Sequence, residues 1–426
     1  PKRFPRFPPL GVDPAAEGRL IEGFSIVWLL FSVVSFGLCN ATSFNVLDHG
    51  AIGDGKTDDS FAFLKAWRAA CQASNSSKLI IPEKRTFLLY PASFDGPCLS
   101  SRLHVKVLGK IIAPDQKSAW DGHHINQWLA FSKVNRLVIN GGGLIDGQGS
   151  VWWSQTCSFT GGGCKGPTAL TFSRCNKLRL SGLTHVNSQR NHMTLNACKG
   201  AIISNLNIIA PKTSPNTDGI DIASSTNIQI LNSNIETGDD CIAISGGSSN
   251  INIYGVYCGP GHGISIGALG KGNDIVENVT VRNCTMKGTL TGVRIKTWQG
   301  GSGHAKRIFF TGIHFITVYN PIIIDQFYCP GQPNCTTKPL AVKVSDVTYS
   351  KISGTSMMDN VINLRCSQSV ACTNVAFDHV YIESMAPGAK PYATCTNAYG
   401  WATHTKPKVT CLKSLPSSPG SRTTAL

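Results

Sequence analysis

"TNIQILN" (226–232) and "SNINIYG" (249–255) share one pattern, in which polar turn residues are followed by apolar residues at every second position. Five more segments repeat it: "NRLVING" (135–141), "NKLRLSG" (176–182), "KGAIISN" (199–205), "ENVTVRN" (277–283) and "KRIFFTG" (306–312). From residue 176 onward these segments start 23 to 29 residues apart, with no amphipathic helix between them. Apolar alternation indicates β-strands, and a repeat of this length indicates coils that stack on one another. The sequence therefore predicts an all-β, single-domain parallel β-helix.

A second repeat sets four apolar residues in register. Ile220, Ile242 and Ile264 follow one another at steps of 22 residues, and Val293 comes 29 residues later. In a β-helix, equivalent positions of successive coils stack about 4.8 Å apart. We therefore expect these four residues to lie on four neighbouring coils, the last reached through a longer loop.

Charged residues gather beside these aligned positions. Asp218, Asp240 and His262 each stand two residues before an aligned isoleucine, which predicts a single column. A lone aspartate at a β-helix turn is more often structural, because its side chain hydrogen-bonds the backbone. Here, however, three more charged residues lie beside the column: Asp239 is one position off it, and Arg294 and Lys296, two apart on a strand, share one face of the following coil. The whole set is therefore interpreted as a functional site.

Several carboxylates in one small cavity cannot all ionise cheaply, so at least one pKa is expected to rise. A carboxyl that keeps its proton can serve as a general acid, while an ionised neighbour activates water. This pair of roles is what hydrolysis of a glycosidic bond requires. Arg294 and Lys296 add fixed positive charge, which suits the carboxylates of a uronic acid polymer.

The charge balance agrees with an anionic partner. Lys and Arg number 39 and Asp and Glu 24, which gives a net charge of +15 over 426 residues. Such a positive excess fits a protein that binds nucleic acid, anionic lipid or acidic polysaccharide. It also fits a basic secreted protein that has no polyanionic partner.

The N-terminal region is expected to hold a leader and a cap. Residues 24–39 form an apolar, uncharged run that is too short for a comfortable membrane span. Residues 1–41 are therefore interpreted as an N-terminal extension with a signal peptide. The alternative is that the apolar run is an uncleaved membrane anchor. Residues 42–411 are expected to form the β-helix and 412–426 a flexible tail. Thr57 is the expected N-cap of a helix that reaches about Ala73 and covers the open end of the solenoid. Its predicted apolar positions are Phe61, Leu64, Trp67 and Cys71.

Cysteine content also favours secretion, because disulfides persist in oxidising compartments. Of 16 cysteines, Cys39 leaves with the signal peptide, so at least one of the other 15 lacks a partner within the chain. Close spacing suggests four loop-closing pairs: Cys157/Cys164, Cys329/Cys335, Cys366/Cys372 and Cys395/Cys411. Glycosylation sequons stand at Asn75, Asn278, Asn283 and Asn334.

Four motifs, in order, resemble the signature blocks of the polygalacturonases, the glycoside hydrolases that cleave pectin. They are "SPNTDG" (214–219), "GDD" (238–240), "GHG" (261–263) and "RIK" (294–296). The resemblance covers about residues 43–411 and is greatest to plant members. It implies a right-handed parallel β-helix and inverting hydrolysis of α-1,4-galacturonan without a metal or organic cofactor. It further implies a disulfide between Cys241 and Cys258, and secretion to the cell wall.

Carried over by position, the resemblance makes Asp239 the general acid. Asp218 and Asp240 match the carboxylates that position and deprotonate water, and His262 matches a histidine that tunes the acid or contacts sugar. His192 follows "SQRN", where many relatives have proline after the serine, and it is not assigned a role.

The remaining matched positions are substrate contacts. Arg294 and Lys296 match binders of galacturonate carboxylates, Tyr328 a substrate-binding tyrosine, and Asn216 a contact within the first motif. The expected partner is pectin or homogalacturonan rather than nucleic acid, bound by a monomer with no stable membrane association after signal cleavage.

Other functions stay open at this point. One is another β-helical uronan enzyme, such as a pectate lyase or a rhamnogalacturonase-like hydrolase; another is a pectin-binding protein that does not cut. A lyase of that kind usually needs Ca²⁺ and a cationic base, so the carboxylate set favours hydrolysis. Endo and exo cleavage are both compatible with the sequence.

Overall fold

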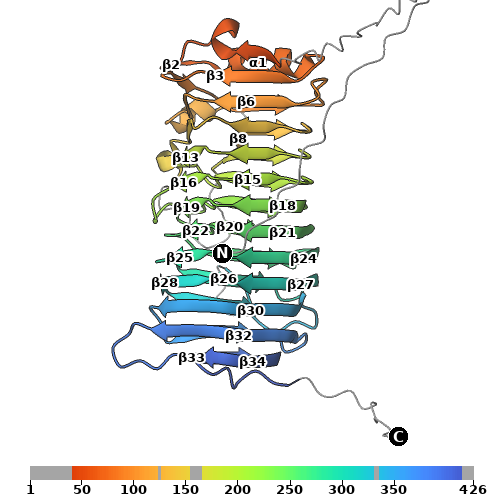
Figure 1. Cartoon of the computed structure of the whole chain (residues 1–426), viewed down its shortest axis with the longest axis vertical. Coiled ribbons are helices and arrows are strands. Elements are labelled where there is room, and N and C mark those ends of the chain that lie inside the picture. Colours follow the sequence, from red (N-terminus) through yellow and green to blue (C-terminus); the bar gives the residue numbers. More distant parts are fainter. Residues whose placement is uncertain (1–40, 123–125, 154–165, 331–334, 415–426) are drawn as a thin grey trace, which may run out of the picture. The chain divides into compact units, whose positions relative to one another are not determined.

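A computed structural model describes residues 41–122, 126–153, 166–330 and 335–414. Within these ranges the chain winds into a parallel β-helix, in which each coil lies on the one before it (Figure 1). Every strand pairing is parallel, and the coils wind in the right-handed sense. The predicted fold class is confirmed.

Each coil contributes one strand to an eleven-stranded sheet. Its strands are β5 (Ala92–Asp95), β8 (Gln127–Ser132), β11 (Thr168–Ser173), β14 (Met193–Asn196), β17 (Ile220–Ala223), β20 (Ile242–Ile244), β23 (Ile264–Leu269), β26 (Thr291–Thr297), β29 (Asn320–Asp325), β31 (Asn360–Arg365) and β33 (Tyr392–Thr396).

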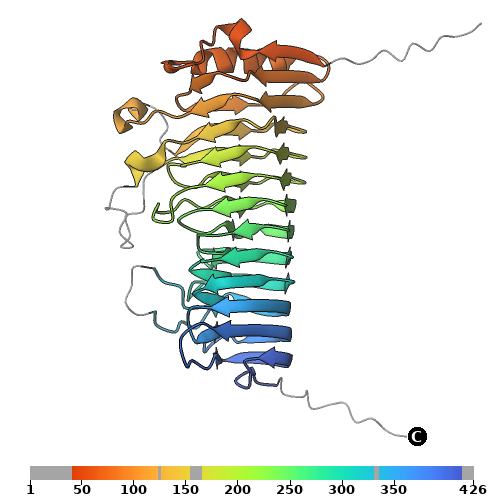
Figure 2. The ribbon, with the colours of Figure 1, turned by 60° about the vertical axis from the view of Figure 1, so that its left-hand side comes forward.

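The rest of each coil belongs to a 23-stranded sheet, usually through two short strands that merge into one in the last coils (Figure 2). Its strands are β1 (Thr42–Asn45), β2 (Asp54–Asp58), β3 (Ser77–Ile81), β4 (Thr86–Leu88), β6 (Leu103–Val107), β7 (Lys110–Ile112), β9 (Val138–Asn140), β10 (Leu144–Asp146), β12 (Arg179–Ser181), β13 (Thr184–Val186), β15 (Ile202–Ser204), β16 (Asn207–Ile209), β18 (Thr226–Leu231), β19 (Asn234–Glu236), β21 (Ser248–Tyr254), β22 (Tyr257–Cys258), β24 (Asn273–Arg282), β25 (Thr285–Lys287), β27 (Ser302–Thr311), β28 (His314–Val318), β30 (Lys343–Ser356), β32 (Cys372–Ser384) and β34 (Ala398–Lys406).

The repeated turn residues have a conformational cause. In six successive coils, from β12 and β13 to β27 and β28, the chain turns between the two short strands through one residue with positive φ, a conformation that glycine and asparagine adopt at least cost. The turn residues of six successive coils are Gly182, Asn205, Asn232, Gly255, Asn283 and Gly312. The alternating apolar residues that flank them point inward and form one continuous core.

The predicted register is confirmed. Ile220 pairs with Ile242, Ile242 with Ile264, and Ile264 with Val293. All four side chains are fully buried. The columns inferred from the sequence are therefore real neighbours on β17, β20, β23 and β26.

The helix α1 (Ser60–Gln72) covers the N-terminal coils, but it starts later than predicted. Thr57 is not its N-cap, because β2 runs to Asp58 and the Asp54 carboxylate accepts the Thr57 backbone N–H at 2.8 Å. The N-cap position is Asp59, whose carboxylate instead accepts the backbone N–H of Ile52 and Gly53.

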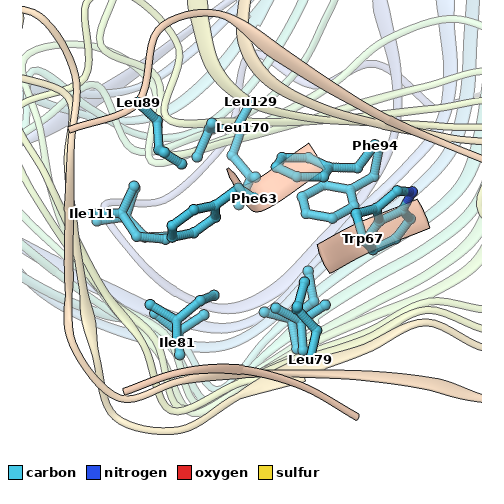
Figure 3. A pocket seen from close by; sticks show the side chains of 14 residues that line it. Phe63, Trp67, Leu79, Ile81, Leu89, Phe94, Ile111, Leu129 and Leu170 are labelled. Atoms are coloured by element: carbon cyan, nitrogen blue, oxygen red, sulfur yellow. The ribbon is translucent and has the colours of Figure 1, made fainter. Parts of the chain in front are cut away.

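The buried face of α1 also differs from the prediction. Trp67 and Cys71 are buried as expected, whereas Phe61 is 74% exposed and Phe63 points into the core. Figure 3 shows Phe63 and Trp67 among the apolar side chains that line a small interior pocket at this end of the β-helix. The helix thus completes the core where no further coil covers it.

Three short 3-10 helices lie outside the coils: η1 (Val46–His49), η2 (Lys117–Trp120) and η3 (Gly149–Trp152). None of the helices in the described ranges is long and apolar enough to cross a bilayer. The predicted signal peptide lies outside those ranges, as does the tail after residue 414. Before that point Lys413 still pairs with the last coil, its backbone N–H donating to the Ala398 carbonyl at 3.1 Å.

The described part of the chain holds five disulfides. Cys241–Cys258, Cys329–Cys335, Cys366–Cys372 and Cys395–Cys411 confirm the predicted pairs, and Cys71–Cys98 adds one. The proposed Cys157/Cys164 pair and the Asn334 sequon lie outside the described ranges. Among the described residues, three buried cysteines are free: Cys175, Cys198 and Cys284. The other three sequon asparagines are exposed: Asn75, Asn278 and Asn283.

Candidate active site

The predicted charged residues converge at the eleven-stranded sheet. Asp218, Asp240 and His262 lie just before the amino ends of β17, β20 and β23, and Arg294 and Lys296 lie within β26. Backbone hydrogen bonds hold the turns together: the Gly219 N–H donates to the Asp240 carbonyl at 2.9 Å, and the His262 N–H to the Asp239 carbonyl at 2.7 Å. The stacking of the coils therefore brings all six predicted side chains to one place.

Asp240 is buried and surrounded by donors. Its Oδ1 accepts from Arg294 Nη2 at 2.8 Å and from Ser265 Oγ at 2.8 Å, while Oδ2 accepts from Lys296 Nζ at 2.7 Å. Burial by itself would raise the pKa of this carboxyl, but the two cations outweigh burial and hold the pKa below its ordinary value. Asp240 is therefore kept ionised.

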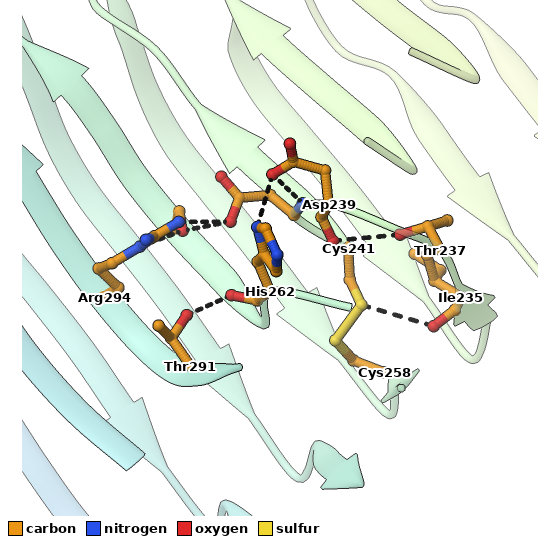
Figure 4. The surroundings of a disulfide bond; sticks show 10 residues. Ile235, Thr237, Asp239, Cys241, Cys258, His262, Thr291 and Arg294 are labelled. Carbon is orange, nitrogen blue, oxygen red and sulfur yellow. Dashed lines mark hydrogen bonds and ion pairs between the residues drawn. A yellow bond between two sulfur atoms is a disulfide. The ribbon is translucent and has the colours of Figure 1, made fainter. Parts of the chain in front are cut away.

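Asp239 lies beside it in a different environment (Figure 4). Its Oδ1 faces His262 Nδ1 at 2.9 Å and accepts the Asp240 backbone N–H at 2.8 Å. The side chains of Asp239 and His262 are about one quarter exposed, against 1% for Asp240. The two adjacent aspartates thus differ in both solvent access and partners.

Asp218 completes the column, and a fourth carboxylate lies next to it. Burial, followed by the charges of Asp221, Asp239 and Asp240, raises the pKa of Asp218 well above its ordinary value. Burial, with the Asp240 charge, likewise raises the pKa of Asp221 to about 7, although Asn191 donates to this carboxylate. The site therefore holds one carboxylate stabilised as an anion and two that favour the protonated form.

Asp221 was missed by the sequence analysis. It alternates with Ile220 and Ile222 along β17, so its side chain points outward, toward the column of charged residues. Its register partner is Ala243, which pairs in turn with Ser265, and Ser265 pairs with Arg294. The alternation was available in the sequence and would have placed Asp221 on this face.

Arg294 and Lys296 do share one face, as predicted, but both bind Asp240 in this structure. Tyr328 lies beside them, with Lys296 Nζ 5.3 Å from the centre of its ring. Trp298 packs edge-on against Tyr328, with the ring centres 5.6 Å apart, and Lys271 Nζ lies over the Trp298 ring, 5.0 Å from its centre. Cations and aromatic rings thus form one wall beside the carboxylates.

Asn216 and His192 occupy supporting positions. Asn216 has a positive φ of 54° in the turn before Asp218, and Thr217 Oγ1 in that turn accepts the Gly238 N–H at 3.0 Å. His192 is fully buried beneath the turn, with its backbone N–H donating to the Asp218 carbonyl at 2.7 Å. His192 is therefore a structural neighbour of the site, away from solvent.

One oxygen or nitrogen from each of Asp239, Asp240 and His262 lies within 4.8 Å of the others, a spacing that could hold a metal ion. The donor set fits a cation poorly, because Asp240 already pairs with two side-chain cations and Asp239 with His262. A divalent cation here would either have to displace Arg294 and Lys296 from Asp240 or be repelled by their positive charges.

Comparisons with known proteins agree with this geometry. Residues 71–408 match the family model "Glycosyl hydrolases family 28". The chain is 48% identical over 381 residues to a probable polygalacturonase of Arabidopsis thaliana (87% of this chain, 82% of the relative). It is 41% identical over 374 residues to polygalacturonase-2 of Solanum lycopersicum (87% and 81%).

Solved structures show the same fold. An endo-xylogalacturonan hydrolase of Aspergillus tubingensis superimposes with a TM-score of 0.69 at 25% identity, over 84% of this chain and 96% of that one. A polygalacturonase of Erwinia carotovora gives 0.68 at 22% identity, over 85% and 97%. The family match, the relatives and the carboxylate-rich site agree: this chain is a glycoside hydrolase that belongs to glycosyl hydrolases family 28.

Proposed function

We propose that this enzyme hydrolyses α-1,4-galacturonosidic bonds of pectin by an inverting mechanism. The observation that carries the proposal is the different environment of neighbouring carboxylates on stacked coils. Asp240 is held ionised by Arg294 and Lys296, while Asp239 meets solvent and His262. Two carboxyl groups in different environments are what an acid and a base at one bond require.

Asp239 is the proposed general acid. Its Oδ1 is engaged by His262 and a backbone N–H, so a proton on Oδ2 would be directed toward the cleaved bond. Asp218 and Asp240 are the proposed pair that holds and deprotonates water, because they occupy one column on adjacent coils. Once ionised, a carboxylate with the raised pKa of Asp218 is also the stronger base of the two.

Arg294, Lys296, Tyr328 and Asn216 are the proposed substrate contacts. A galacturonate carboxylate that binds Arg294 and Lys296 would compete with Asp240 for these two cations and weaken the ion pairs of Asp240. The net charge of +15 favours the approach of a polyanion. Tomato and Arabidopsis relatives named as polygalacturonases support the same substrate, and a secreted enzyme of the cell wall would meet it there.

The test is the chemistry of the products formed from polygalacturonate. Hydrolysis releases new reducing ends and forms no unsaturated sugar, so ultraviolet absorbance does not rise. β-Elimination releases reducing ends and also forms an unsaturated sugar that absorbs ultraviolet light. Proton NMR of the first product distinguishes inversion from retention at the anomeric carbon. An unsaturated product, or retention, would refute the proposed mechanism, and unchanged substrate would support a pectin-binding protein instead.

A further inference from the structure

Six exposed cations lie along one corner of the β-helix, where the chain leaves the eleven-stranded sheet. We call this set the basic corner: Arg102, Lys133, Arg136, Arg174, Lys177 and Lys199. They occupy the segments that follow β5, β8, β11 and β14, which are the orange to yellow-green coils of Figure 1. Part of the excess of positive charge in the sequence therefore lies at this corner.

Two columns run along this corner. Ser132 pairs with Ser173, so the residues that follow them, Lys133 and Arg174, stack on adjacent coils. In the second column, His104 pairs with Val138, and Val138 pairs with Arg179. The residues two positions before these three therefore also stack on adjacent coils: Arg102, Arg136 and Lys177. Neighbouring coils in such a column are about 4.8 Å apart.

The columns are held by the backbone and left without counter-ions. The Lys177 N–H donates to the Lys199 carbonyl at 2.8 Å, and the Lys133 N–H to the Ser173 carbonyl at 2.9 Å. None of the six cations forms an ion pair with any residue in the described ranges. Like charges this close repel one another, so an anion that bridges them is favoured.

The corner also offers a binding surface. A groove of about 410 Å³ is lined by Lys133, Arg136 and Lys177 together with Ser100, Ser101 and Asn135. Asp95 is an acidic residue close to the corner, because it pairs with Ser132, the residue before Lys133. The local balance therefore stays strongly positive.

This surface is separate from the candidate active site. The carboxylates Asp218 and Asp240 precede the amino ends of β17 and β20, whereas the basic corner follows the carboxyl ends of β8, β11 and β14. The two regions therefore lie at opposite ends of the strands of one sheet, on different coils.

We propose that the basic corner binds a second stretch of polyuronate, outside the sugars at the point of cleavage, and holds the enzyme on long chains. The inference rests on the proposed function for the identity of the polymer. A linear polymer with a carboxylate on every sugar presents regularly spaced anions, and the two columns present regularly spaced cations. Nucleic acid and anionic membranes are the competing occupants.

The test uses a corner variant, Lys133→Asn/Arg136→Asn/Arg174→Asn/Lys177→Asn, in the full chain. Asparagine is chosen because all four positions have positive φ, which it tolerates well. The matched control removes four exposed cations elsewhere that form no ion pair within the described ranges: Lys65→Asn, Lys351→Asn, Lys390→Asn and Lys408→Asn. Binding of long polygalacturonate is measured at low and at physiological salt, alongside kcat/KM on a short galacturonate oligomer.

We expect the corner variant to bind long polygalacturonate about tenfold more weakly at low salt, with a reduced salt dependence and an unchanged kcat/KM on the short oligomer. Equal affinity of corner and control variants for the long polymer would overturn the proposal. So would tighter binding of the wild type to duplex DNA or to phosphatidylserine vesicles through the same residues. Absence of hydrolysis by the wild type would refute the proposed function, while the binding comparison would still report on the corner.

Discussion

Lys296 Nζ lies 2.7 Å from Asp240 Oδ2, and the two side chains are only 9% and 1% exposed. They belong to β26 and to the turn before β20, with one coil between them. A buried pair of this kind is costly to break from one side, because the remaining charge stays buried without its partner. Asp240 and Lys296 therefore connect the stability of the central coils to the charge state of the site.

Lys296→Met is expected to cost about 3 kcal/mol of unfolding free energy, measured by urea denaturation. It removes one of the two cations that lower the Asp240 pKa, so the acid limb of kcat/KM should move to higher pH. Lys351→Met, an exposed lysine, serves as the control. An unchanged acid limb would show that Asp240 is not the group that must be ionised.

Asp239→Asn should lower kcat on polygalacturonate by at least about 10²-fold with little change in KM, since general acid catalysis contributes this much. The amide keeps the shape of the side chain and an oxygen for His262. Thermal unfolding should stay close to that of the wild type. Turnover within a few-fold of the wild type would rule out Asp239 as the acid.

Asp221→Asn should change how stability depends on pH. The Asp221 pKa is raised to about 7 in the fold, so its contribution is full below the unfolded pKa of 3.8 and is lost as pH rises through about 7. We expect the variant to lose less stability than the wild type between about pH 5 and pH 8. Urea midpoints at both values measure this, and parallel curves for the two proteins would contradict it.

His185 and His192 are expected to make the enzyme sensitive to acid. Their buried rings pack edge-on at 5.0 Å, and burial lowers the pKa of His192 to about 4 and that of His185 well below its ordinary value. Stability is thus full above the unfolded pKa of 6.5 and falls as pH drops toward about 4.

The fall from His192 alone is on the order of 3 kcal/mol, given about 1.4 kcal/mol per pKa unit. His185→Leu should make the acid limb of stability shallower, because neither ring nitrogen of His185 has a hydrogen-bond partner in the described structure. The comparison is made by urea denaturation across the same pH range. His314→Leu, an exposed histidine on β28 that forms no ion pair within the described residues, provides the control for losing one imidazole.

Removal of the Cys241–Cys258 disulfide should affect both stability and catalysis. It spans 17 residues and follows Asp240 directly, and closing a loop of this size stabilises by about 3 kcal/mol. Cys241→Ala/Cys258→Ala should lower kcat as well, because the turn that carries Asp239 and Asp240 is freed (Figure 4). Cys366→Ala/Cys372→Ala, with a span of 6 residues, should lower stability somewhat less and leave kcat unchanged.

Much of the fold follows from local sequence. Apolar alternation predicts the strands, and in six successive coils a turn residue with positive φ favours glycine or asparagine, as at Asn205 and Gly255. The 22-residue steps predict the register of Ile220, Ile242 and Ile264, and the strand pairings confirm it. Local signals failed at α1, where Asp54 and Asp59 bind backbone groups of the preceding loop and delay the start of the helix.

The sequence by itself determined the β-helix, the column of Asp218, Asp240 and His262, and the family to which they belong, because these depend on periodicity and on residue type. Only the tertiary structure decided how the charges differ. Whether a carboxyl gains or loses a proton depends on which cations and donors reach it from other coils. Asp240 meets Arg294 and Lys296 from β26, more than 50 residues away in the chain, whereas Asp239, its neighbour in sequence, meets His262 instead.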